Sequence, residues 1–252
     1  MPRFAAFALA LLAAAPAFAQ DEATEAPLGV SEGGLDFSGG LELMSDFRFR
    51  GVSRSDEDPA LQLRANLSHD SGFYAGARGT TVQGADSFRL RDPAYGGLGD
   101  AQLDLYLGYG ARLGGGFEVD AGALYYVFAG ADGATDYVEP YASLSYLIGP
   151  VYATAGAKYA PAQDAIGDED MVYLFGQLDV AVPFRPWSFT AQAGHQDWGA
   201  FGDYWTWSLG VEHHVQALGL SGAYLGLRYV DTDLPSRSGQ DAGLAVYARL
   251  DF

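Results

Sequence analysis

Residues 35–50 read Leu-Asp-Phe-Ser-Gly-Gly-Leu-Glu-Leu-Met-Ser-Asp-Phe-Arg-Phe-Arg. Every second side chain from Leu35 to Phe49 is apolar or small, whereas the intervening side chains from Asp36 to Arg50 are mostly polar or charged. Successive side chains of a strand point to opposite faces, so this period of two predicts one strand with an apolar and a polar face. Strands of soluble domains have about 5–6 residues, and tilted membrane-spanning strands about 9–11. The stretch is therefore typical of a transmembrane barrel wall, with lipid outside and water inside.

The N-terminus has the pattern of a secretory signal. Arg3 precedes an apolar run over residues 4–15, and Ala17-Phe18-Ala19 is the small-x-small motif of a signal peptidase site. The run is too short for a membrane-spanning helix, which needs about 20 apolar residues. We expect residues 1–19 to be a signal peptide and the acidic residues 20–34, which lack periodicity, to be a flexible periplasmic lead-in.

The composition excludes several classes of function. The chain has 32 Asp and Glu against 14 Lys and Arg, and this excess of acids makes nucleic acid an unsuitable partner, because phosphate binding needs positive charge. It has no Cys, so neither disulfides nor a thiolate metal site can form. We expect no cofactor and no bound metal.

The alternation of residues 35–50 recurs to the end of the chain. Further strands are predicted at 60–68, 73–81, 102–113, 117–128, 138–147, 151–159, 171–182, 188–196, 204–215, 220–230 and 241–252. Long polar connections alternate with brief turns, as in bacterial outer-membrane barrels, whose even strand number leaves both termini in the periplasm. The sequence therefore predicts an all-β fold, a transmembrane antiparallel β-barrel of about twelve strands over residues 35–252, in the cell outer membrane.

Aromatic residues on the predicted lipid-facing side gather at the two ends of the strands, where membrane interfaces favour them. The periplasmic set is Phe37, Phe73, Phe117, Tyr146, Phe189 and Phe252, and the outer set is Phe47, Phe49, Tyr125, Tyr159, Trp205, Trp207 and Tyr229. The alternating C-terminus, residues 246–252, resembles the signal by which the barrel-assembly machinery recognises its substrates. We expect Phe252 to contact that machinery and the belts to contact lipid and lipopolysaccharide.

Several motifs in the first half resemble the TorF family of outer-membrane porins. The matching motifs are Ser45-Asp46-Phe47-Arg48-Phe49-Arg50-Gly51-Val52-Ser53, Pro59-Ala60-Leu61-Gln62, Ser71-Gly72-Phe73-Tyr74-Ala75-Gly76, Leu103-Asp104-Leu105-Tyr106 and Asp120-Ala121-Gly122-Ala123-Leu124-Tyr125-Tyr126. Phe47 replaces a Tyr expected in the family, and the resemblance is strongest over residues 43–126. It implies an outer-membrane barrel and names no transported substrate.

The inward face predicted by the alternation carries both signs of charge, together with tyrosines that we expect to narrow the bore. The predicted channel-lining residues are Glu42, Asp46, Arg48, Arg50, Arg64, Arg78, Asp104, Tyr106, Arg112, Glu118, Tyr126, Lys158 and Arg228. Their charges either pair as a structural ladder that holds the wall in register or act as a transport filter, since charged lumens occur in both kinds of barrel.

The predicted outer loops are acidic. Two clusters stand out, Asp56-Glu57-Asp58 and Asp168-Glu169-Asp170. Carboxylates around a low-dielectric opening raise the local cation concentration, which predicts a cation preference. The alternatives are bridging to lipopolysaccharide phosphates through divalent cations, or simply keeping exposed loops soluble. The clusters lack the oxygen spacing of a dedicated calcium loop.

Catalysis is not predicted. A lipid hydrolase in this setting needs a nucleophile beside a histidine on the outer part of the lipid face. His195 is at that height, but the adjoining strand offers Trp205 and Trp207 there and no serine. The sequence favours a narrow, cation-preferring channel for passive diffusion of small hydrophilic solutes. The alternative is a non-conducting structural or surface-interaction barrel.

Overall fold

The computed structural model describes residues 34–83, 98–131, 133–216, 222–237 and 239–252. The predicted signal peptide and almost all of the predicted lead-in lie outside these residues. Within them, the helices are two short 3-10 turns, Asp164–Ile166 and Gly199–Phe201. No helix of this part of the chain is long and apolar enough to cross a membrane.

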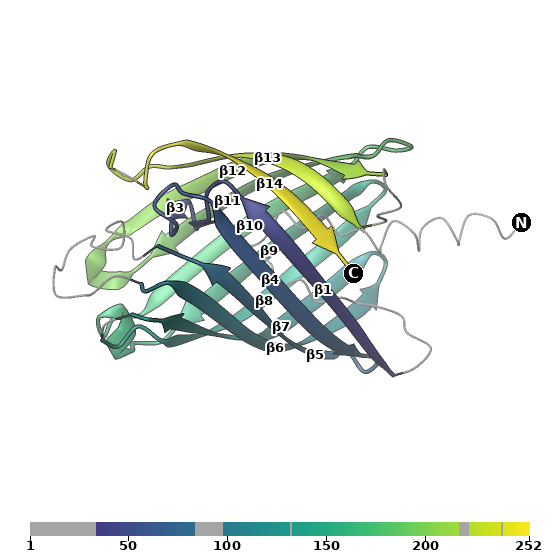
Figure 1. The fold of residues 1–252 in the computed structure, drawn as a ribbon. Coiled ribbons are helices and arrows are strands. Elements are labelled where there is room, and N and C mark those ends of the chain that lie inside the picture. The colour runs from purple at the N-terminus through teal and green to yellow at the C-terminus, as the bar shows by residue number, and fades with distance from the viewer. Residues whose placement is uncertain (1–33, 84–97, 132, 217–221, 238) are drawn as a thin grey trace, which may run out of the picture.

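Twelve strands form a closed antiparallel barrel (Figure 1). They are β1 (Leu35–Met44), β4 (Ala60–His69), β5 (Phe73–Thr81), β6 (Ala101–Gly114), β7 (Phe117–Ala129), β8 (Tyr137–Ile148), β9 (Val151–Ala160), β10 (Met171–Ala181), β11 (Trp187–Asp197), β12 (Asp203–Val215), β13 (Ala223–Thr232) and β14 (Gly243–Asp251). Each strand pairs with its neighbours along the chain, and β14 closes the barrel on β1 from Gly40↔Asp251 to Met44↔Tyr247. The predicted fold class is confirmed.

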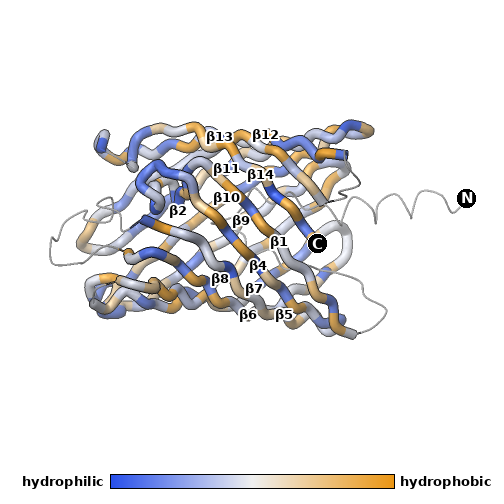
Figure 2. The backbone as a smooth tube through the Cα atoms, in the orientation of Figure 1, coloured by the Kyte–Doolittle hydropathy of each residue, from blue (hydrophilic) through white to orange (hydrophobic). Residues whose placement is uncertain are grey.

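The alternation of the strands sets the two faces of the wall. On β6, Leu105 and Leu107 point outward and are 40% and 65% exposed, whereas Gln102 and Asp104 point inward and are buried. Apolar and polar residues alternate in this way along the strands around the barrel (Figure 2). The arrangement is the opposite of that in a soluble protein, whose apolar side chains face inward. A lipid-facing apolar surface and a polar interior are the properties of a transmembrane barrel.

The two ends of the barrel differ in their connections. Leu35 and Phe252 lie at one end, where Gly39 N donates to Phe252 O at 2.7 Å, and the connections there are brief. We name this the turn end. Longer connections, including residues 161–170 and 233–242, lie at the opposite end, which we name the loop end.

The first wall strand is shorter than predicted. β1 ends at Met44, and residues 45–58 turn into the barrel as a small hairpin at the loop end (Figure 1). In this segment, which we name the inner hairpin, β2 (Arg48–Phe49) pairs with β3 (Val52–Ser53). The prediction of one strand over 35–50 was wrong because the period of two continues through β2, so the pattern does not show where the chain leaves the wall.

Aromatic side chains surround the outer face at both ends. Of the predicted belt residues, those exposed are Phe37, Phe73, Phe117, Phe189 and Phe252 at the turn end, and Tyr125, Tyr159, Trp205 and Trp207 at the loop end, whereas Tyr146 and Tyr229 are half-buried. Phe47 and Phe49, predicted to belong to the outer belt, are instead 1% and 5% exposed in the interior, because they are part of the inner hairpin.

Candidate channel lumen

A carboxylate near the start of the inner hairpin holds its two arms together. Asp46 accepts hydrogen bonds from Ser53 Oγ at 2.6 Å, from Ser55 Oγ at 3.2 Å and from Arg48 Nε at 2.5 Å. The turn itself uses left-handed backbone conformations at Arg50 and Gly51, with φ of 48° and 87°. A glycine suits this position because it has no Cβ to clash.

The tip of the hairpin lies against the wall formed by β12, β13 and the connection to β14. A Cβ at Gly51 would contact the Thr232 methyl group and lie 2.6 Å from Thr206 Oγ1, so the tip is closely packed. Tyr204 Oη donates to Arg50 O at 3.1 Å. Arg48 Nη1 donates to the backbone oxygen of Asp241 at 2.6 Å. These contacts fix the backbone of the hairpin on one side of the lumen.

The Arg50 side chain reaches the facing strands. Its Nη2 donates to Glu139 Oε2 on β8 at 2.7 Å, and its Nη1 donates to Gln196 Oε1 on β11 at 2.6 Å. The guanidinium carbon lies 4.4 Å from the ring centroid of Tyr173 on β10. The side chains of Arg50 and Glu139 are 1% and 0% exposed, so this ion pair is removed from water.

Arg54 makes a second set of contacts toward β6 and β7. Its Nη1 donates to Gln102 Oε1 at 2.5 Å, and its guanidinium lies over the Phe49 ring at 3.5 Å. Phe49 in turn meets Tyr126 of β7 edge to face at 5.7 Å between centroids. Together, Arg50, Arg54 and Phe49 connect the hairpin to five wall strands on the other side of the lumen.

Burial shows how completely the hairpin occupies this level. Inward side chains from strands around the barrel are at most 2% exposed here: Gln62, Thr80, Gln102, Asp104, Tyr126, Glu139, Lys158, Tyr173 and Gln196. Side chains lining a wide water-filled passage would be accessible to solvent. The loop-end half of the lumen is therefore filled by the inner hairpin and the wall side chains that contact it.

The inner wall below and beside the hairpin is crossed by ion pairs. Arg249 Nη2 and Glu212 Oε2 are 2.9 Å apart, and Arg64 pairs with Asp251 across the β1–β14 closure. Further pairs are Arg78 with Asp104 at 2.8 Å and Arg112 with Glu118 at 3.0 Å. Arg78–Asp104 and Arg112–Glu118 link neighbouring strands, whereas Arg249–Glu212 and Arg64–Asp251 each span one intervening strand, and all four agree with a structural ladder.

Inward tyrosines lie flat along the wall because glycines on adjacent strands receive their rings. A Cβ at Gly108 would be 2.5 Å from Tyr74 Cζ, and one at Gly122 would be 2.7 Å from Tyr141 Cζ. Tyr74 and Tyr141 also hydrogen bond to each other, and Tyr74 Oη donates to Asp120 at 2.6 Å. At these positions the rings cover the inner face of the wall, and the expectation that the tyrosines narrow the bore stays a prediction.

The predicted channel-lining residues fall into two groups. One group lies on the inner face of the wall: Glu42, Arg64, Arg78, Asp104, Tyr106, Arg112, Glu118, Tyr126, Lys158 and Arg228. The other, Asp46, Arg48 and Arg50, belongs to the inner hairpin. Arg54 lies between the predicted strands 35–50 and 60–68, where a polar connection is expected, and it is 1% exposed inside the barrel. The Arg50-Gly51 pair was the available signal for a turn there.

The two acidic clusters occupy two connections at the loop end. Asp56 and Glu57 have φ of 57° and 64°, and Glu57 Oε1 lies 3.6 Å from Arg48 Nη2. Asp170 accepts hydrogen bonds from Tyr159 Oη at 3.1 Å and from Ala162 N at 2.8 Å. Glu57 and Asp170 therefore also shape their own loops.

His195 lies on the outer face of β11. Its Nε2 is 3.0 Å from Asp203 Oδ2, and its ring is 4.7 Å from the Trp205 ring between centroids. These contacts hold the imidazole against the wall beside the aromatic belt. The absence of a catalytic site stays a prediction.

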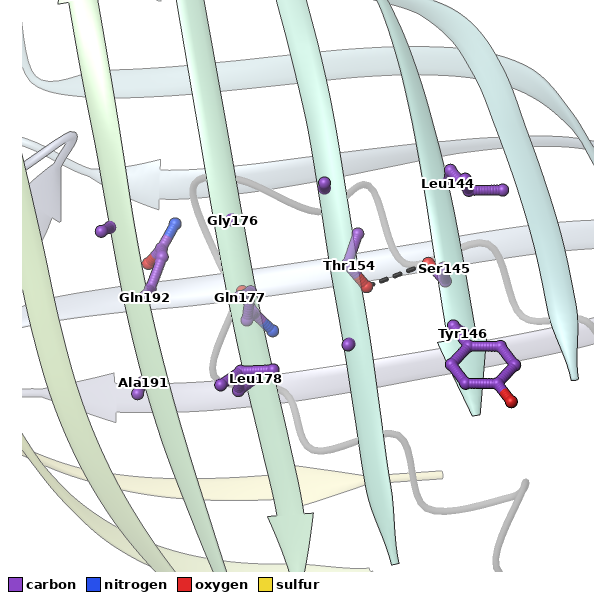
Figure 3. A pocket seen from close by; sticks show the side chains of 12 residues that line it. Leu144, Ser145, Tyr146, Thr154, Gly176, Gln177, Leu178, Ala191 and Gln192 are labelled. Carbon is purple, nitrogen blue, oxygen red and sulfur yellow. Dashed lines mark hydrogen bonds between the residues drawn. The ribbon is translucent and has the colours of Figure 1, made fainter. Parts of the chain in front are cut away.

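A shallow apolar depression lies on the lipid-facing side of β8–β11 (Figure 3). Small side chains at Ala155, Gly176 and Ala193 leave it between the larger Leu144 and Leu178. The register places these side chains on the outer face. The depression is therefore part of the surface that faces lipid and is separate from the lumen.

The sequence matches the model of the bacterial family Gcw_chp, whose function is unknown, over residues 29–247. The chain belongs to this family. No curated protein sequence matches it. Among solved structures it is similar to the KdgM porin, with a TM-score of 0.57 and 8% identity over 85% of this chain and 99% of that one. It is also similar to the NanC porin, with a TM-score of 0.53 and 13% identity over 84% and 97%. At such low identity these likenesses show the porin fold alone.

Proposed function

We propose that this chain is an outer-membrane porin-like channel through which small hydrophilic solutes diffuse passively. The observation that carries the proposal is a closed twelve-strand barrel with an apolar outer face and a charged inner face. KdgM and NanC are porins with the same fold, and the motifs of residues 43–126 resemble TorF-type porins. In this proposal the turn end faces the periplasm and the loop end faces outward.

The proposed channel prefers cations. The acidic clusters 56–58 and 168–170 stand at the loop end, while most charges of the inner wall are paired. Carboxylates at the entrance attract cations, and salt weakens this attraction because the Debye length falls from about 10 Å at 0.1 M to about 3 Å at 1 M.

Planar-bilayer recordings test both parts of the proposal. Purified protein is expected to give discrete conductance steps, and reversal potentials across a salt gradient are expected to show cation preference that increases at low salt. Replacing all six acids of the two clusters with Asn or Gln is expected to weaken that preference. Absence of steps over repeated insertions contradicts the channel, and an anion preference contradicts the role of the acidic entrance.

One observation favours the alternative of a non-conducting barrel that serves as a structural or surface-interaction protein. The inner hairpin fills the loop-end half of the lumen. If it stays there permanently, the loops and the outer face act on lipopolysaccharide or another surface molecule and nothing passes. The same bilayer recordings distinguish this function from the channel.

A further inference from the structure

We infer that the inner hairpin is a gate, which closes the loop-end half of the lumen at rest and leaves it when solutes pass. This inference rests on the proposed channel function. It assigns the control of passage to residues 45–58 instead of the acidic entrance alone.

The barrel does not need the hairpin for its closure. β1 pairs with β4 from Leu35↔His69 to Met44↔Ala60 and with β14 on its other edge, and neither pairing includes β2 or β3. The covalent chain connects the hairpin to the wall at residues 45 and 59. It can therefore change position while every wall strand keeps its two neighbours.

Phe47 and Phe49 of the hairpin pack in the buried apolar cluster, and the contacts that its arginines make across the lumen are polar ones that water can replace. Arg50 binds Glu139 and Gln196, and Arg54 binds Gln102. Burial of a polar group costs much free energy only when the group has no hydrogen-bond partner. The side chains of Glu139, Gln196 and Gln102 become hydrated once the lumen fills with water. A gate held by such contacts can open onto a hydrated wall.

The return arm of the hairpin contains a place where the backbone can change. Asp56 and Glu57 both adopt left-handed conformations, which residues other than glycine seldom adopt. Such conformations persist where surrounding contacts hold them, and they cluster at switch regions. Glu57 Oε1 accepts a hydrogen bond from Gly239 N at 3.1 Å, which ties this part of the arm to the β13–β14 connection.

Opening changes the charge of the passage. In the closed arrangement Arg50 and Arg54 lie at the same level as Glu139 and Asp104. When the hairpin leaves, both guanidiniums leave with it, whereas the two carboxylates stay on β8 and β6. Loss of the two guanidiniums leaves this level of the lumen more negative and favours cations there, while Asp104 keeps its ion pair with Arg78.

A disulfide between the tip and the wall tests the gate directly. A Cβ at Gly51 would lie 3.3 Å from Thr206 Cβ, close to the separation of about 3.5–4.5 Å that a disulfide requires. The variant carries Gly51→Cys and Thr206→Cys, with Thr232→Ser to remove the methyl group that would contact the new side chain. The chain has no other Cys. The control carries Gly51→Cys and Thr232→Ser only.

The gate predicts a reversible loss of passage. In bilayers, the oxidised double-Cys variant is expected to lose its conductance steps and to recover them on addition of dithiothreitol, whereas the control responds to neither treatment. A heat-dependent gel shift establishes that each variant has folded. Steps that persist unchanged in the fully oxidised variant would overturn the gate.

A deletion gives an independent measurement. Arg54 N donates to Phe47 O at 2.7 Å, so the base of the hairpin is narrow and two glycines can replace residues 47–54. This variant is expected to conduct more than the wild type and to prefer cations more strongly. If it conducts like the wild type, the channel stands and the gate is refuted. If even this variant gives no steps, the proposed channel function itself fails.

Discussion

The buried ion pair between Arg50 and Glu139 offers a quantitative test of how the hairpin is held. Replacing Glu139 with Ala leaves the Arg50 guanidinium buried without its carboxylate, and breaking a buried pair in this way costs about 3–5 kcal/mol. Since the hairpin can leave the lumen, we expect the cost to appear as displacement of the hairpin and not as unfolding of the barrel. A value of about 3 kcal/mol corresponds to about a hundredfold larger displaced population.

Thiol labelling can measure that population. Val52 is 3% exposed, and a Val52→Cys substitution places the only thiol of the chain in the hairpin. Maleimide labelling through transient opening is expected to be about a hundredfold faster when Glu139→Ala is added, because the rate follows the open population.

The matched control for this labelling experiment is Glu118→Ala. Glu118 pairs with Arg112, whose side chain is 40% exposed at the turn end, and exposed pairs contribute at most about 1 kcal/mol. Labelling of Val52→Cys should be unaffected by this change. Labelling rates that agree within about twofold for Glu139→Ala and its parent would refute the reasoning, since a hundredfold change is expected.

Three further predictions concern the wall. Leu105→Arg is expected to destabilise the folded barrel by about 2–4 kcal/mol if the residue lies near the bilayer midplane, and Tyr106→Arg by less, as measured by urea unfolding in lipid vesicles. Gly108→Ala should lower the free energy of unfolding by about 1–3 kcal/mol in the same assay, because a tyrosine ring occupies the space of the new methyl group. Gly79→Ala places its methyl group in open space and should leave the free energy of unfolding unchanged. Deleting Phe252 should reduce the amount of folded protein in the outer membrane, and unchanged levels would contradict a recognition signal.

Most of the wall could be predicted because the alternation of apolar and polar residues along each strand determines which side chains face lipid. Along β6, each Leu faces lipid and each alternate polar residue faces inward, so the strand and its orientation follow from consecutive residues. The same holds for the inner face, where Asp104 and Arg78 lie opposite each other on paired strands. The pairing of neighbouring strands along the chain then follows from the short turns.

The inner hairpin could not be predicted because distant contacts decide its position. Phe47 and Phe49 have the same spacing as the lipid-facing residues of β1, and only the contacts of Arg50 with β8 and β11 keep this segment inside. Those partners are 89 and 146 residues away in sequence. An aromatic residue flanked by arginines suits either environment, so its burial depends on tertiary structure.

The pairing of β1 with β14 is the step that closes the barrel during folding. This pairing, Gly40↔Asp251 to Met44↔Tyr247, joins the two ends of the sequence and includes fewer residues than the pairing of β1 with β4. Contacts so distant in sequence form slowly, because the whole intervening chain must first be ordered. Until they form, the curved sheet has two free edges whose backbone groups can pair with other chains. The time between synthesis of β14 and its pairing with β1 is thus when the protein is most prone to aggregate and most dependent on a helper that covers both edges.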